Sequence, residues 1–292
     1  MSIEIRGLRK SFTGKQVLTG VDLTVAPGEF VAVLGANGSG KSTVLRCAVG
    51  LQQPDSGTVE INGGAAMVFQ QIHLVSRRTV LDNVCSGALG RLKLRQSVFF
   101  PRLVREEAME CLARVGLADR ASERAGKLSG GQQQRVAIAR ALCQRAKVIL
   151  ADEPVSALDP SAAEQVVSLL ASLTDEGMAV LAVLHQPELA QRFAHRIVGM
   201  AEGKVAFARK AADLDGPQLA SLYPTAGSGA AIASSSPPAP AAPLATPAAP
   251  PAPPAPATPA AAPAPAPATP PEPGSPTATS LDSATSLPRG SR

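Results

Sequence analysis

Apolar and polar residues alternate near the start of the chain, with Ile3, Ile5 and Leu8 among the apolar positions. The alternation returns over residues 21–25. Because successive side chains of a strand point to opposite faces, both stretches predict half-buried strands. Residues 30–34 are apolar without interruption, which predicts a strand that is buried on both faces.

The middle of the chain, about residues 80–145, shows helical spacing instead. It predicts two helices, of which the second ends near Gly116, and a third helix that begins after Ser129. Strands that alternate with helices on both sides of this insert favour an α/β fold with a mainly parallel core sheet. The remaining predicted elements are helices over 42–49 and 161–173 and strands over 58–61, 148–151, 180–184, 197–200 and 205–207.

Composition changes sharply from about residue 226 onward. Of the 27 prolines in the 292 residues, 19 fall between Pro237 and Pro288, among alanine, serine and threonine. Such a segment lacks the apolar surface that would offset its ordering entropy. We therefore predict one globular domain over residues 1–225 and a disordered or polyproline-II tail over 226–292. The tail is either an inert extension or a docking segment.

Charge and cysteine content exclude several function classes. The net charge of +5 is too small and too scattered to predict a nucleic-acid partner, although it suits an anionic nucleotide or membrane surface. Four widely spaced cysteines without metal-ligand spacing predict reduced, mostly buried thiols. The N-terminal pattern is that of a strand and not of a signal peptide. No stretch reaches the ~18 apolar residues of a membrane span, so we expect any membrane contact to go through another protein.

A glycine-rich loop follows the apolar run at 30–34 and precedes the helix at 42–49. The pattern Gly35-x4-Gly40-Lys41-Ser42 is a phosphate-binding loop in the context it requires. Glycines let backbone N–H groups wrap a phosphate, Lys41 supplies a cation, and the Ser42 hydroxyl is a Mg²⁺ ligand. The alternative, an ordinary turn with a surface lysine, does not explain this context. The predicted nucleotide-binding residues are Gly35, Ala36, Asn37, Gly38, Ser39, Gly40, Lys41, Ser42 and Thr43.

Two acids end the apolar run at 148–151. A carboxylate at the tip of a buried strand is costly unless a cation lies nearby, so Asp152 is a candidate Mg²⁺ ligand. Glu153 is then placed to orient and polarise an attacking water.

The string Leu128-Ser129-Gly130-Gly131-Gln132 opens the third helix of the insert. Ser129 suits a helix N-cap, but two glycines after a cap are unfavourable by about 1 kcal/mol each relative to alanine. Their presence indicates that bare backbone is needed for close approach to a ligand. N–H groups at a helix N-terminus would suit a γ-phosphate presented by another copy of the chain.

The order of these motifs, followed by Ser156-Ala157-Leu158-Asp159, resembles the ATP-binding cassette (ABC) of a transporter ATPase over residues 3–223. The resemblance implies a P-loop NTPase fold with an antiparallel β subdomain, two copies sharing ATP and Mg²⁺, and catalytic roles for Glu153 and His185. It further implies that Gln70 senses Mg²⁺ and that Asp159 crosses the dimer interface. Phe12 is a candidate to stack on adenine, its alternative being a core phenylalanine. Gln71 could compete with Gln70, and His73 and His195 are expected on the surface or in packing.

Several stretches, including residues 68–84, 99–101, 128–142 and 184–186, are similar to the phosphonate import ATP-binding proteins of bacteria. That kinship implies two membrane permease subunits, an indirect periplasmic solute-binding protein, and a place on the cytoplasmic face of the inner membrane. Between Asn62 and Met67 the chain is shorter than the family pattern. Phosphate, phosphite or another oxyanion is the alternative cargo. A soluble ABC protein acting on nucleic acid or ribosomes, and a P-loop kinase or GTPase, are the rival classes.

Overall fold

The computed structural model describes residues 1–92 and 100–214, which belong to one compact unit. The predicted domain boundary near residue 225 and the predicted tail over 226–292 lie outside the described residues, as does Phe99.

A three-stranded antiparallel sheet forms the first layer, in the order β2-β1-β4. Its strands are β1 (Ile3–Phe12), β2 (Lys15–Val25) and β4 (Ser56–Ile61). The alternating residues Ile3, Ile5 and Leu8 are buried, as their pattern predicts. Residues 21–25 are only the second half of β2, whose first half pairs with the end of β1 through Phe12↔Lys15.

A six-stranded sheet forms the second layer, in the order β5-β6-β7-β3-β8-β9. All of its neighbours pair in parallel except β8 and β9, which form the predicted closing hairpin. Its strands are β3 (Phe30–Leu34), β5 (Ala65–Val68), β6 (Val148–Asp152), β7 (Ala179–Val183), β8 (Arg196–Ala201) and β9 (Lys204–Lys210).

Edge strand β5 is an element that the sequence pattern does not predict. Only Asn62, Gly63 and Gly64 connect it to β4, so the shortened segment becomes a tight turn. The backbone N–H groups of Lys147 and Val148 donate to the carbonyls of Gly63 and Gly64, at 3.0 and 3.2 Å. These bonds start the parallel pairing of β5 with β6.

The predicted helices lie near their predicted positions, and the helix over residues 187–193 is one that the sequence pattern does not predict. The longer ones are α1 (Lys41–Ala48), α2 (Val80–Cys85), α3 (Arg102–Arg114), α4 (Gly130–Leu142), α5 (Pro160–Asp175) and α6 (Pro187–Phe193). After α2 the chain continues as a 3₁₀ helix, η1 (Ser86–Arg91). A β-carbon at Gly87 would lie 2.1 Å from the Arg140 carbonyl oxygen, so glycine lets η1 pack closely on α4. Short 3₁₀ turns cover η3 (Ala118–Arg120), η4 (Ala125–Lys127) and η5 (Ala211–Asp213).

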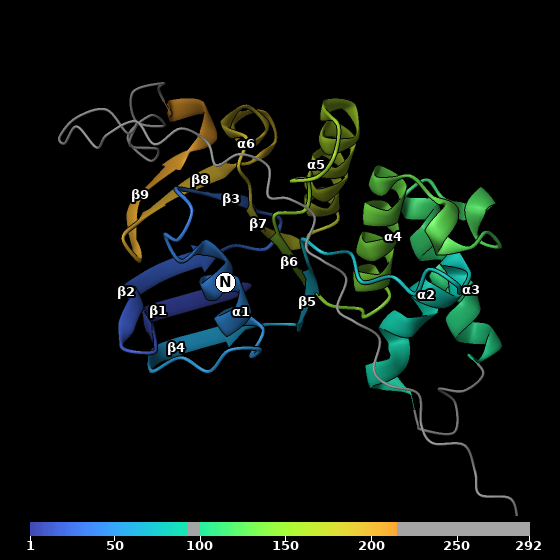
Figure 1. Cartoon of the computed structure of the whole chain (residues 1–292), viewed down its shortest axis with the longest axis horizontal. Helices are drawn as coiled ribbons and strands as arrows, with labels where there is room; N and C mark the ends of the chain where they lie inside the picture. Colours follow the sequence, from blue (N-terminus) through green and yellow to red (C-terminus); the bar gives the residue numbers. More distant parts are fainter. Residues whose placement is uncertain (93–99, 215–292) are drawn as a thin grey trace, which may run out of the picture. The chain divides into compact units, whose positions relative to one another are not determined.

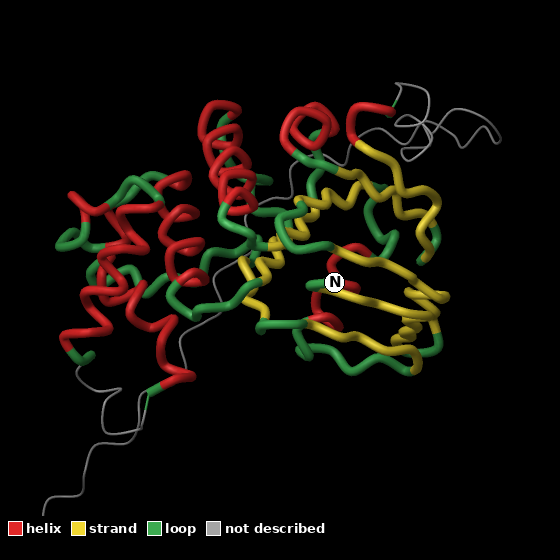
Figure 2. Tube along the Cα trace, turned by 180° about the vertical axis from the view of Figure 1, so that it is seen from behind, coloured by secondary structure: helices red, strands yellow, loops and turns green. Residues whose placement is uncertain are grey.

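Alternate residues of β3 face two different cores. Phe30, Ala32 and Leu34 pack in the core that includes α4, α5 and α6, whereas Val31 and Val33 pack against α1 and the antiparallel sheet. Figures 1 and 2 show the resulting layers, with α5 and α6 over one face of the parallel sheet and the antiparallel sheet over the other. Helices α2, α3 and α4 contact one another and form the predicted helical insert beside α5 (Figure 1).

Candidate functional site

The phosphate-binding loop joins the carboxyl end of β3 to α1, and glycine geometry shapes it. Gly35 has φ 148°, and a β-carbon there would lie 2.2 Å from the Met200 carbonyl oxygen. Gly40 is the N-cap of α1 in the left-handed region, with φ 100° and Leu18 in the space a β-carbon would need. Both positions require glycine on steric grounds as well as for phosphate approach.

Lys41 is the first residue of α1 and lies buried, with 5% of its surface exposed. Its Nζ donates to the carbonyl oxygens of Gly35 and Ala36, at 2.8 and 2.9 Å. Burial lowers the pKa of the Lys41 ammonium, while the carboxylates of Glu153 and Asp152 raise it. Among the described residues, the buried Ser39 hydroxyl makes no hydrogen bond, so it is a polar group that lacks a partner inside the loop.

Ser42 and Asp152 meet as a pair of hard oxygen donors. The Ser42 Oγ donates to Asp152 Oδ1 at 2.6 Å, and Asp152, only 4% exposed, also lies 3.7 Å from the Arg46 guanidinium. A hydroxyl and a carboxylate at a phosphate loop fit Mg²⁺, which uses one or two carboxylates together with phosphate oxygens and water. The described residues contain no cluster of three or more His, Cys, Asp and Glu that could hold a metal ion.

Glu153 and His185 also lie together, at the ends of β6 and β7. The His185 Nε2 is 2.7 Å from Glu153 Oε1, and both side chains are partly exposed. Glu153 has φ 48°, a conformation that is uncommon for a residue with a β-carbon and is often found at functional sites. Gln70 is exposed, and its Nε2 donates to the Ser156 hydroxyl at 3.2 Å, which links the loop after β5 to the loop after β6.

A cavity of about 270 Å³ opens over the phosphate-binding loop. Lys41, Ser42 and Glu153 line it together. Sequence reasoning missed Lys15, Gln16 and Val17 in its wall, because no motif marks the start of β2. Phe12 lies outside the lining; it is 39% exposed, and the Lys10 ammonium lies 5.4 Å from its ring centroid. The alternative that Phe12 is a core residue is therefore wrong.

Residues 129–132 lie away from this cavity and form the start of α4. Ser129 is the N-cap in a reciprocal capping box with Gln132, with a Ser129 N–H bond to Gln132 Oε1 at 3.0 Å and a Gln132 N–H bond to Ser129 Oγ at 3.4 Å. Gly130 and Gly131 pack beside the start of α5, where the Asp159 carboxylate caps the helix by accepting from the Ala162 N–H at 3.0 Å. A single chain thus brings together the phosphate loop, Asp152, Glu153 and His185, and leaves Ser129 to Gln132 and Asp159 outside the cavity.

Comparison with known proteins places the chain in a family. The ABC transporter family model matches residues 18–156. The phosphonates import ATP-binding protein PhnC of Frankia casuarinae is 47% identical over 251 residues, which cover 80% of this chain and 99% of that protein. The chain belongs to the ABC transporter ATP-binding proteins.

Other matches agree with this family. The hypophosphite import ATP-binding protein HtxD of Stutzerimonas stutzeri is 41% identical over 76% of this chain and 71% of that protein. Among solved structures, the dimeric post-hydrolysis state of the ATP-binding cassette MJ0796, bound to ADP and Pi, is 32% identical with a TM-score of 0.63. The match covers 73% of this chain and 100% of the MJ0796 chain. The ABC cassette fold and ATP binding expected from the motifs are thereby confirmed.

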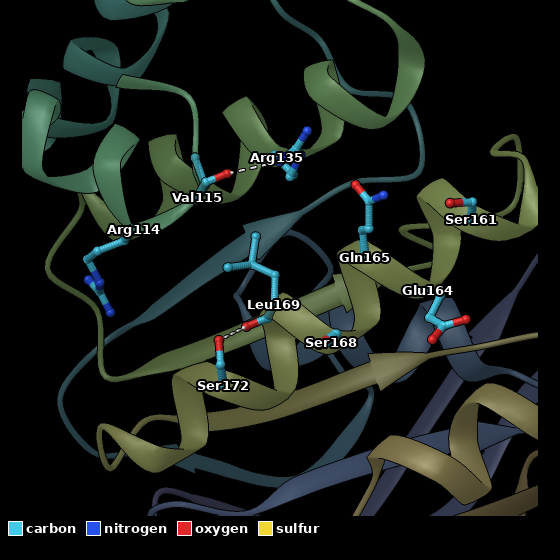
Figure 3. A pocket seen from close by; sticks show the side chains of 9 residues that line it. All are labelled: Arg114, Val115, Arg135, Ser161, Glu164, Gln165, Ser168, Leu169 and Ser172. Atoms are coloured by element: carbon cyan, nitrogen blue, oxygen red, sulfur yellow. Dashed lines mark hydrogen bonds between the residues drawn. The ribbon is translucent and has the colours of Figure 1, made fainter. Parts of the chain in front are cut away.

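The histidines outside the motifs have packing or surface positions, as expected. The His195 Nδ1 accepts the Phe30 N–H at 3.0 Å, and exposed His73 places its ring edge-on to Phe69. Within this ABC cassette a second cavity, of about 590 Å³, lies between α5 and the α3–α4 part of the insert. Figure 3 shows its lining of Arg114 and Arg135 from the insert and a polar stripe of α5.

Proposed function

We propose that this chain is the ATP-hydrolysing subunit of a bacterial ABC importer for phosphonates. The main support is the pairing of Glu153 with His185 beside Lys41, Ser42 and Asp152, in a cassette whose relatives include phosphonates import ATP-binding proteins. ATP binding and hydrolysis would be coupled to solute uptake through partner subunits.

The loop residues bind the phosphates of ATP. Lys41 exchanges its two backbone carbonyl partners for oxygens of the β- and γ-phosphates, which suits a buried ammonium better than neutral acceptors. The unpartnered Ser39 hydroxyl and the backbone N–H groups at the start of α1 supply further donors. Phe12 is the candidate aromatic for adenine, because its ring is exposed and it pairs with Lys15, which lines the cavity over the phosphate-binding loop.

Ser42 and Asp152 would hold Mg²⁺, with Gln70 as a further oxygen ligand. When bound, Mg²⁺ neutralises charge on the phosphate oxygens during transfer. Gln70 contacts Ser156 and is exposed, so its side chain is free to turn toward the phosphates.

Glu153 acts on the attacking water, and His185 holds the Glu153 carboxylate in place. The contact of His185 Nε2 with Glu153 Oε1 at 2.7 Å leaves the second carboxylate oxygen available for a water, which it would orient and polarise. In this proposal His185 would also contact the γ-phosphate. Glu153→Gln should retain ATP binding, abolish turnover and accumulate a closed dimer. Glu188→Gln, an exposed change on α6, is the matched control. Normal hydrolysis by the Glu153 variant would remove this assignment.

Two copies of the chain complete the site. The capping box satisfies only part of the start of α4, whose remaining N–H groups and positive dipole end suit the γ-phosphate bound to the other copy. Each phosphate loop would then face Ser129 to Gln132 of the other subunit, with Asp159 crossing the interface. The similar cassette MJ0796 is dimeric in a post-hydrolysis state bound to ADP and Pi, which supports a dimeric working unit.

Two permease subunits and a periplasmic solute-binding protein complete the importer in this proposal. Within the described ranges, every helix is too short or too polar to span a bilayer. We propose that the chain sits peripherally on the cytoplasmic face of the inner membrane, with the segment from Gln70 to Val84 and the insert contacting the permeases.

Growth experiments test the cargo. A strain lacking this chain should fail to grow on a phosphonate as sole phosphorus source and should recover with wild type but not with the Glu153→Gln variant. The similarity to a hypophosphite import protein favours hypophosphite or another phosphorus oxyanion as the second candidate. If the strain that lacks this chain grew on a phosphonate but failed to grow on hypophosphite or another phosphorus oxyanion, the result would support the second candidate.

A further inference from the structure

The hairpin between β1 and β2 carries Phe12, the aromatic residue proposed for adenine. Phe12 pairs with Lys15 across a two-residue turn, Thr13-Gly14, and both turn residues have positive φ, 46° and 81°. Positive φ at both central positions is typical of tight β-hairpins. The turn therefore fixes the register of β1 against β2, but it does not hold the other side of β1.

The strand on that other side ends before the tip of the hairpin. β1 lies between β2 and β4, and its pairing with β4 stops at Arg9↔Ser56 (Figure 1). Beyond this pair, the end of β1 has no strand partner on the β4 side in the part of the chain that the structure describes. Asp55, directly before β4, takes this place. Its N–H donates to the Arg9 carbonyl at 2.9 Å, and its carboxylate accepts the Ser11 N–H at 2.6 Å.

The same carboxylate holds a lysine beside the Phe12 ring. Asp55 Oδ1 accepts from Lys10 Nζ at 2.8 Å, and this ammonium lies 5.4 Å from the centroid of the Phe12 ring. A cation within about 6 Å of a ring centroid is attracted to the ring. The hydrogen bond from Lys10 also holds the pKa of the Asp55 carboxyl below its ordinary value, so the carboxylate is charged at neutral pH. Contacts thus run from Asp55 through Lys10 to a ring that stays partly exposed.

We propose that Asp55 is a positioning residue for nucleotide binding, which acts through Lys10 to hold Phe12 where its ring stacks on adenine. The inference rests on the proposed role of Phe12 at the base. Without the Asp55 carboxylate, the end of β1 loses its hydrogen bond on the β4 side and the lysine loses its anchor. The ring would then sample more orientations, and ordering it again would weaken base binding. The phosphates should be unaffected, because Lys10, Phe12 and Asp55 lie outside the lining of the phosphate-loop cavity.

Two ligands separate the base from the phosphates. The full-length protein is titrated calorimetrically with ADP and with inorganic tripolyphosphate, each with Mg²⁺, since tripolyphosphate offers phosphates without a base. Phe12→Ala should weaken ADP binding about tenfold or more, which is the size of effect that loss of a stacked base produces. Asp55→Ala should weaken it about three- to tenfold, because the ring remains but is less ordered. Both variants should bind tripolyphosphate within about twofold of wild type.

Steady-state kinetics and matched variants complete the test. Asp55→Ala should raise the KM for ATP and leave kcat unchanged. Lys10→Met should weaken ADP binding as Asp55→Ala does, and the double variant should lose no more than either single variant, because the two residues act in series. Asp22→Ala is the control. The Asp22 carboxylate accepts the Gly7 N–H at 2.7 Å, so it makes the same kind of bond to β1 away from Phe12. This control should bind ADP like wild type.

Three results would overturn the proposal. Equal weakening of ADP and tripolyphosphate binding in Asp55→Ala would show a general structural effect. Unchanged ADP binding in Asp55→Ala, together with weakened binding in Phe12→Ala, would remove the positioning role and leave the role of Phe12 intact. Unchanged ADP binding in Phe12→Ala would remove both roles. If Asp55→Ala fails to fold, Lys10→Met decides by the same comparison, because it breaks the contact with the ring and leaves the Asp55 bond to the Ser11 backbone.

Discussion

Gly130 and Gly131 make separable contributions that alanine substitutions can measure. Both open α4 and neither has a positive φ, so backbone conformation does not require glycine at either position. Their surroundings differ. A β-carbon at Gly131 would lie 2.8 Å from the Ala162 Cβ, whereas one at Gly130 would meet only the Leu158 Cδ2, at 3.3 Å.

The expected free energies follow from this difference. Alanine in place of helical glycine stabilises by up to about 1 kcal/mol. At Gly131 the contact with Ala162 is shorter than real Cβ contacts, and overpacking costs about 1–3 kcal/mol. Gly131→Ala should therefore lower the free energy of unfolding by about 1–2 kcal/mol. Gly130→Ala should leave it unchanged or raise it by up to about 1 kcal/mol, because the end of the Leu158 side chain can shift.

Urea unfolding and steady-state ATPase assays on the same preparations separate stability from function. Gly130→Ala should lose at least about tenfold in ATPase activity while remaining folded, because the new methyl group occupies the surface offered to the other subunit's phosphate. Adding Ala162→Gly to Gly131→Ala should recover stability beyond the sum of the two single changes. Normal ATPase activity in Gly130→Ala would refute the need for bare backbone, and wild-type stability in Gly131→Ala would refute the packing argument.

Three further predictions concern other residues. Lys41→Ala should abolish nucleotide binding in a fluorescent-nucleotide titration while circular dichroism stays unchanged; retained affinity would contradict its role at the phosphates. Arg140→Gln should destabilise the protein by about 2–3 kcal/mol in urea unfolding, because the half-buried guanidinium donates to the Ile72 and His73 carbonyls at 3.0 and 2.9 Å; Arg135→Gln is the comparison. Burial would raise the pKa of Glu29, but hydrogen bonds from Arg196 and the Ala26 N–H hold it below its ordinary value of 4.5. Glu29→Gln should therefore lower the free energy of unfolding by about 1–3 kcal/mol above pH 4.5, and this difference from wild type should disappear as the pH falls through the lowered pKa. A difference that does not change with pH would contradict this role of Glu29.

The phosphate loop and most strands could be predicted because their information is local. A continuous apolar run, glycines and a lysine within 30–42 suffice to identify a strand, a loop and a helix start. Strand β5 escaped prediction because its first two residues are alanine, which is depleted in strands, and helix α6 because its seven residues make fewer than two full helical turns. Neighbouring elements create them: β5 exists through its pairing with β6, and Pro187 starts α6 directly after the loop from β7.

The amino-acid sequence alone predicts which residues hold phosphate, Mg²⁺ and water, and it identifies the family of ABC transporter ATP-binding proteins. Which of these residues meet depends on the tertiary structure. The Ser42–Asp152 and Glu153–His185 contacts, the wall formed by residues 15–17, and the close approach of Gly131 to Ala162 all join segments distant in the chain. The physical reason is that parallel strands bring their carboxyl ends to one edge of the sheet, and spacing along the chain does not encode the distances across that edge.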